Sequence, residues 1–133
     1  MRALDTNVLV RLLVQDDPQQ VIEARRWVER GAWVSTLVLA EAVWVLSAVY
    51  ERDPREIASA VELLLNHESL SLQDSEAVSS ALVRFRERPS VGFSDCLVLE
   101  LAREAGHLPL GTFDRNLSKF EGTQKLNSND PSA

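Results

Sequence analysis

The sequence contains one cysteine, Cys96, and only two histidines among its 133 residues. A single cysteine cannot form an internal disulfide, and no group of Cys and His residues has the spacing of a zinc site. These absences argue against a disulfide-rich secreted scaffold and against a zinc module. They favour a protein of the reducing cytoplasm whose chemistry uses other ligands.

Glycine and proline are also scarce, with five of each, while 45% of residues are hydrophobic and 26% are charged. No glycine belongs to a Gly-rich phosphate loop or to a nucleophile elbow. The composition is that of a folded globular domain and not of a disordered or fibrous chain. We expect one domain over residues 1–126, followed by a polar, disordered tail at residues 127–133.

A long hydrophobic run without charge is missing. Residues 32–50 come close to the length of a membrane span, but Glu41 interrupts them. Because an ionised Glu in the middle of a bilayer is costly, this segment predicts a strand followed by a buried helix, and we expect no membrane association.

Positive charge is in deficit, since 14 Lys and Arg residues face 20 Asp and Glu residues and the net charge is −6. This is the wrong sign for a protein that attracts nucleic acid through its overall field. Divalent cations bound by acidic side chains would reverse the sign locally.

Hydrophobic periodicity predicts strands that alternate with amphipathic helices. This order is typical of an α/β fold with a four- to five-stranded parallel sheet and helices on both faces. The three tryptophans, Trp27, Trp33 and Trp44, are expected in the core. The predicted strands are residues 2–5, 32–35, 69–72, 108–112 and 123–126.

Two aspartates each follow a predicted strand. Asp5 follows the first and Asp114 the fourth, so both are expected at the carboxyl edge of the sheet, where ligands bind in such folds. An aspartate at a strand end is also a common helix cap or turn residue, and this interpretation stays open.

Two further acids lie in apolar segments. Glu41 is the only charge between Gly31 and Glu51, and Asp95 begins a predicted helix. A buried carboxylate without a basic partner must be protonated or must bind a cation. The alternatives are that Glu41 reaches water at the rim of the core and that Asp95 only interacts with the helix dipole.

Taken together, the four carboxylates are typical of a site for a hard cation such as Mg²⁺ or Mn²⁺. Such an ion activates water and neutralises charge on a phosphate during hydrolysis. The predicted catalytic and metal-binding residues are Asp5, Glu41, Asp95 and Asp114.

Four short motifs in this order resemble those of the PIN-domain ribonucleases, in particular the VapC toxins of bacterial toxin–antitoxin pairs. The similarity extends from Met1 to about Leu126. The motifs are Leu4-Asp5-Thr6-Asn7-Val8-Leu9, Ser35-Thr36-Leu37 through Ala40-Glu41, Phe93-Ser94-Asp95-Cys96-Leu97, and Thr112-Phe113-Asp114 with Leu117 and Phe120.

The resemblance implies a PIN-like fold and an Mg²⁺- or Mn²⁺-dependent endoribonuclease that cuts RNA by in-line water attack. It implies a cognate antitoxin and a homodimer as well. Asp5 and Asp95 resemble direct metal ligands, Asp114 a direct or water-mediated ligand, and Glu41 a residue that holds a metal-bound water. The residues expected to support these ligands through hydrogen bonds are Thr6, Asn7 and Thr112. Asn116 replaces an acid present in some members, so the number of bound metal ions, one or two, stays open.

Basic side chains on helices are candidates for phosphate contact, although most such residues are simply solvated. The candidates are Arg11, Arg25, Arg26, Arg30, Arg84, Arg86 and Arg88. Of these, the expected RNA contacts are Arg11, Arg25, Arg26, Arg84 and Arg86. Two other functions stay open: a catalytically inactive domain of the same fold that binds RNA or protein, and a metal-dependent DNA nuclease or phosphatase.

Overall fold

The computed structural model describes residues 1–127, so the predicted disordered tail lies almost entirely outside the described residues. The helices are α1 (Thr6–Leu13), α2 (Pro18–Val28), α3 (Thr36–Ala48), α4 (Pro54–Leu65), α5 (Ser75–Glu87) and α6 (Phe93–Ala105), with 3₁₀ turns η1 (Pro89–Val91) and η2 (Leu117–Lys119). The strands are β1 (Arg2–Ala3), β2 (Ala32–Val34), β3 (Leu70–Leu72), β4 (Leu110–Thr112) and β5 (Thr123–Lys125).

Short-range signals in the sequence set the helix boundaries. The Asp53 side chain accepts a hydrogen bond from the backbone N–H of Glu56 at 2.8 Å, and the Glu56 side chain accepts one from the backbone N–H of Asp53 at 3.1 Å, which forms a capping box. At the other end of a helix, Gly106 terminates α6 with φ of 80°, a conformation that glycine adopts without strain. Asp5 is the N-cap of α1, so the residue that ends the first predicted strand also starts this helix.

All strand pairs are parallel, and the predicted α/β class is confirmed. The expectation of one sheet is wrong, because the strands form a three-stranded sheet in the order β1-β2-β3 and a separate pair, β4-β5. The ladder of β4 is made with β5, and the N–H of Leu110 donates to the carbonyl of Gly122 at 2.8 Å. The sequence predicts strands but not which of them are neighbours, since pairing in a parallel sheet joins distant segments.

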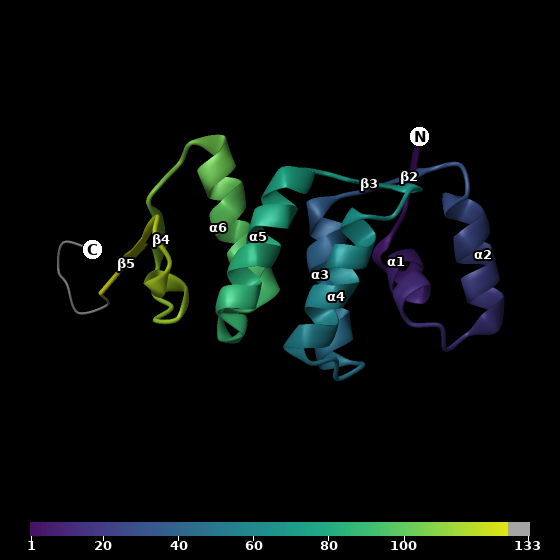
Figure 1. Cartoon of the computed structure of the whole chain (residues 1–133), viewed down its shortest axis with the longest axis horizontal. Helices are drawn as coiled ribbons and strands as arrows, with labels where there is room; N and C mark the ends of the chain where they lie inside the picture. The colour runs from purple at the N-terminus through teal and green to yellow at the C-terminus, as the bar shows by residue number, and fades with distance from the viewer. Residues whose placement is uncertain (128–133) are drawn as a thin grey trace.

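Figure 1 shows how the elements are arranged. The helices stand side by side, with α2 at one end of the molecule and the β4–β5 pair at the other, beyond α6. The core runs through this row and includes Leu9, Leu39, Val61, Val78 and Leu99, each almost fully buried. Within residues 1–127, no helix is both long and apolar enough to span a bilayer.

The two faces of the three-stranded sheet differ in burial. Ala32, Val34 and Leu70 are buried against helices, whereas Trp33 and Ser71, which point to the opposite face, are exposed. Helices therefore cover one face of this sheet more completely than the other.

The expectation that the tryptophans form the core is wrong. Trp27 and Trp33 are each 38% exposed, and Trp44 is 65% exposed. Trp27 lies at the sheet edge, where its indole N–H donates to the carbonyl of Ala3 at 2.9 Å. Trp44 lies on the solvent side of α3, whose apolar residues surround the whole helix, so composition alone did not identify the buried side.

Candidate functional site

Asp5 and Glu41 are brought to the same part of the molecule by Thr6. Asp5 caps α1 at the end of β1, and its carboxylate accepts a hydrogen bond from the N–H of Thr6 at 2.7 Å. The hydroxyl of Thr6 donates to Glu41 Oε2 at 2.8 Å. Thr6 therefore connects the end of β1 to α3, and one carboxylate lies on each side of it.

Glu41 is exposed, so the expectation of a buried carboxylate at this position is wrong. The neighbouring residues Ala42 and Val43 face the core instead. The Glu41 carboxylate is thus able to reach water, which is the alternative that the sequence left open.

Asp95 and Asp114 form a second pair. Asp95 is partly buried in the first turn of α6. Burial raises the pKa of Asp95, and the nearby negative charge of Asp114 raises it further. These two carboxylates are close enough to repel each other.

The turn after β4 fixes the position of Asp114. The hydroxyl of Thr112 accepts a hydrogen bond from the N–H of Asp114 at 3.0 Å, and Asp114 Oδ1 accepts one from the N–H of Leu117 at 2.9 Å. Asp114 thus serves as a turn residue as well, but within residues 1–127 only one of its carboxylate oxygens accepts such a bond, and the carboxylate remains exposed. The Thr112 hydroxyl thus contacts the backbone of Asp114, and its predicted support of the metal ligands stays a prediction.

The four predicted acids therefore lie as two pairs. Within residues 1–127, no group of three or more His, Cys, Asp or Glu side chains is placed so that it could hold a metal ion. Asp5 and Asp114 follow strands of different sheets, so the expectation that they share one sheet edge is wrong. A common site of all four acids stays a prediction.

The donor chemistry of each pair fits a hard cation. None of the four acids forms an ion pair with a basic side chain in the described part of the chain, so their charges are not neutralised by the protein. Mg²⁺ is commonly bound by one or two carboxylates, with waters and substrate phosphates completing its coordination. A pair such as Asp95 and Asp114 can make that contribution.

The basic side chains expected to contact RNA differ in their surroundings. Arg11 donates to the hydroxyl of Tyr50 at 2.6 Å and pairs with Asp16. Two others also lie in ion pairs, Arg84 with Glu100 and Arg86 with Glu62. On α2, Arg26 forms only an exposed pair with Glu23, and no ion pair of Arg25 occurs within residues 1–127.

Asn7 follows Thr6 on the exposed side of α1 and makes no contact with the four acids in the described residues. It lines a pocket of about 440 Å³ between α1 and α2, together with Arg11 and Trp27. Its predicted support of a metal ligand stays a prediction.

Sequence reasoning missed Glu100, the one buried charged residue among residues 1–127, which is 2% exposed. Arg84 Nε donates to one of its carboxylate oxygens at 3.3 Å and Arg103 Nε to the other at 2.8 Å. Glu100 lies four residues after Cys96, on the buried side of α6, and three before Arg103. This helical spacing was the available signal.

Cys96 is fully buried next to Asp95. Burial raises the pKa of the Cys96 thiol to about 12, and the negative charges of Asp95 and Glu100 contribute. A thiol of this kind is protonated at neutral pH, so it is a core side chain and not a nucleophile.

The parallel α/β fold carries one aspartate after β1 and another after β4, and carboxylates are the ligands that metal-dependent hydrolases use for hard cations. The family model of the PIN domain matches residues 2–122. The chain belongs to the PIN-domain family, whose members are generally nucleases that use divalent metals. Comparison with curated proteins and with solved structures found no match.

Proposed function

We propose that the protein is an endoribonuclease that hydrolyses RNA phosphodiester bonds with Mg²⁺ or Mn²⁺, through Asp5, Glu41, Asp95 and Asp114. The observation that carries this proposal is the pair of carboxylates Asp95 and Asp114, which lie close enough that the negative charge of Asp114 adds to the effect of burial in raising the pKa of Asp95. No basic side chain of the described residues pairs with either acid. A cation between them relieves the repulsion, and family membership makes a phosphodiester the expected substrate.

The bound cation, one ion or two, supplies Lewis-acid activation and neutralises charge on the phosphate. Asp95 and Asp114 would hold it as a pair, and Asp5 would join them once the ion draws the two pairs of acids together, since no three acids within residues 1–127 are grouped for a metal as they stand. Glu41, held by the Thr6 hydroxyl, orients the attacking water in line with the leaving oxygen. Hydrolysis leaves a 5′-phosphate and a 3′-hydroxyl. Thr6 and Thr112 position the acids through their hydrogen bonds, and Asn7, exposed two residues after Asp5, is proposed to support the metal-bound form.

Arg25 and Arg26 are the expected RNA contacts best supported by the structure, since both are exposed and neither belongs to a buried ion pair. Arg11, Arg84 and Arg86 must leave an intramolecular partner before they can contact phosphate. Their contribution to RNA affinity is therefore smaller.

We propose further that the enzyme is a cytoplasmic toxin, silenced by a cognate antitoxin, and that it forms a homodimer. Support comes from apolar side chains exposed on and after α3, with Leu37 at 68%, Trp44 at 65% and Val49 at 61%. Exposed apolar patches of this kind mark protein interfaces. Expression of the chain should arrest bacterial growth, the Asp5→Asn variant should not, and the product of a neighbouring antitoxin gene should restore growth.

Cleavage of labelled RNA and DNA with and without Mn²⁺ tests the nuclease. RNA should be cut only with metal, and Asp5→Asn or Asp114→Asn should lower the rate by about 10²- to 10³-fold, as loss of a charge-stabilising group does. Asp74→Asn is the matched control, because Asp74 makes no side-chain cap bond and Asn tolerates its left-handed backbone (φ of 49°).

The other possible results identify the rival functions. A chain that binds RNA and never cuts it is a binding module of the same fold. A chain that cuts only DNA, or only phosphate monoesters, removes the ribonuclease assignment. Cleavage that is unaffected by the Asp5 and Asp114 substitutions places the chemistry elsewhere.

A further inference from the structure

A basic pocket lies at the amino end of β1, whereas Asp5 follows the carboxyl end of that strand. Its volume is about 370 Å³, and it is lined by Met1, Arg2, Arg26, Glu29, Arg30 and Gly31. Three of the six lining residues are arginines, in a chain whose net charge is −6. The pocket is therefore locally positive, although the molecule as a whole is negative.

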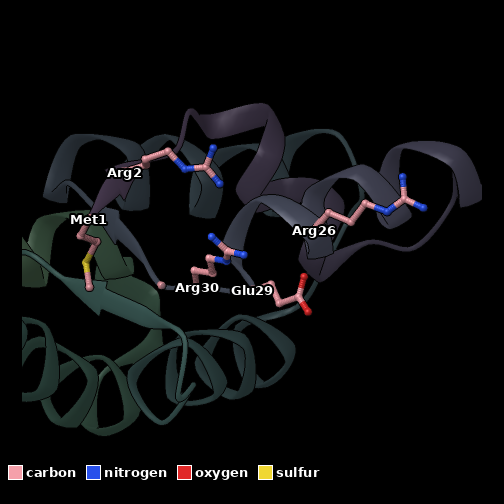
Figure 2. A pocket seen from close by; sticks show the side chains of 6 residues that line it. Met1, Arg2, Arg26, Glu29 and Arg30 are labelled. Atoms are coloured by element: carbon pink, nitrogen blue, oxygen red, sulfur yellow. The ribbon is translucent and has the colours of Figure 1, made fainter.

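Two guanidinium groups extend into the same space. Figure 2 shows the side chains of Arg2 and Arg30 directed toward each other, while Arg26 extends away along α2. The guanidinium of Arg2 lies 3.6 Å from the centre of the Trp27 ring and donates to the backbone carbonyl of Trp27 at 3.3 Å. Arg2 is therefore held in place before any ligand arrives.

Compensation of the negative end of the α2 dipole explains only part of this cluster. Arg2 serves that role, because its bond goes to the last turn of the helix. Arg30 makes no hydrogen bond or ion pair of its side chain within residues 1–127. Its side chain is directed toward the guanidinium of Arg2, and no carboxylate of the described residues forms an ion pair with it. A bound anion would stabilise these two positive charges.

We propose that Arg2 and Arg30 bind a backbone phosphate of the RNA strand, a proposal that rests on the proposed ribonuclease function. Guanidinium groups match phosphate through paired hydrogen bonds. Trp27, beneath Arg2, also lines the neighbouring pocket between α1 and α2, which continues to Asn7, two residues from Asp5. An RNA strand that follows this surface would pass from the two arginines, across the Trp27 ring, which is suited to base stacking, and on toward Asp5.

The test is the affinity of a fluorescein-labelled single-stranded RNA, measured by anisotropy in EDTA, where no cleavage can occur. Arg30→Gln should weaken binding roughly five-fold, the upper range for one exposed charge contact, and should lower the slope of log affinity against log salt by about 0.7. Glu29→Gln should strengthen binding, since it removes the negative charge beside the pocket. Arg55→Gln is the matched control, because Arg55 is an exposed arginine on α4, outside this pocket.

The outcomes separate this proposal from the nuclease proposal. If the protein cuts no RNA but Arg30→Gln weakens RNA binding, the phosphate site is supported and the ribonuclease proposal is rejected. Equal losses in Arg30→Gln and Arg55→Gln, or an unchanged salt slope, overturn the site even if cleavage is observed. Polyglutamate that competes as well as RNA, with the same dependence on Arg30, overturns the assignment to a nucleic acid. Arg30→Lys, which keeps the charge without the paired donors, should recover only part of the affinity.

Discussion

Two acids on the same helix have opposite surroundings. Glu100, in the middle of α6, is 2% exposed and receives one hydrogen bond from Arg84 and one from Arg103. Asp95, in the first turn, has no basic partner in the described residues, and burial and then the like charge of Asp114 raise its pKa. The chain thus supplies bases to the carboxylate that must be stable in the core. It leaves the carboxylate at the helix end able to accept a cation.

The largest effect on stability is expected from Glu100→Gln. This change leaves two arginines without their shared acid, and we expect a loss of about 3 kcal/mol in the free energy of unfolding. Urea denaturation measures it. Glu104→Gln, an exposed acid on the same helix, should change stability by less than about 0.5 kcal/mol. Equal losses of stability in the two variants would show that the buried, ion-paired Glu100 contributes no more to folding than an exposed acid.

The next effect is stabilisation by metal. Mn²⁺ at ten times its Kd should raise the free energy of unfolding by about 1.4 kcal/mol, a rise in Tm of about 5 °C. Asp95→Asn should abolish this rise, whereas Glu104→Gln should keep it. Differential scanning fluorimetry shows both. A rise that persists in Asp95→Asn places the cation away from α6.

A smaller effect follows from the raised pKa of Asp95, which is due first to burial and then to Asp114. The folded state holds the Asp95 proton more tightly than the unfolded state, so stability falls as pH rises from the ordinary value of 3.8 through the raised pKa, and is constant above it. At neutral pH Asp95→Asn should therefore stabilise the protein, because it removes the charge that the folded state disfavours, and the rise in Tm should be smaller than the rise caused by metal.

The difference in stability between wild type and Asp95→Asn should disappear below the ordinary pKa of an aspartate, because both forms are then neutral. Carbon-13 NMR of the Asp95 carboxyl group gives its titration directly. A pKa at or below the ordinary value would show that the Asp95–Asp114 repulsion is absent in solution.

The smallest effect concerns Cys96, which lies between the two acids along α6. With a thiol pKa of about 12 and no exposed surface, Cys96 should not react with iodoacetamide in the native protein at pH 8. Glu100→Gln should accelerate labelling, since a less stable core opens more often. Rapid labelling of the wild type would mean that the start of α6 is open to solvent.

Local features could be predicted from the sequence, and long-range pairing could not. The caps at Asp53 and Gly106 lie within a few residues of the helices that they bound, so their signals are contained in short segments. The separation of β4 and β5 from the other strands depends on contacts between distant residues. For this reason the acids could be identified individually, while their grouping into two pairs could not.

The same dependence on distant contacts explains why the burial of two glutamates could not be predicted correctly. Glu100 was missed because its partner Arg84 comes from another helix, and Glu41 was expected inside because α3 is apolar on every side. The hydrogen bond between Thr6 and Glu41 joins residues 35 apart in sequence, so no local sequence pattern could predict it.

The exposed tryptophans give the protein built-in optical probes. The Trp27 ring is in contact with the guanidinium of Arg2, so its fluorescence should respond when an anion occupies the pocket beside it. Trp44, on a different helix and more exposed, should instead shift its emission to shorter wavelength when a protein partner covers α3. Single-tryptophan variants could therefore report the two binding events separately, without any added label.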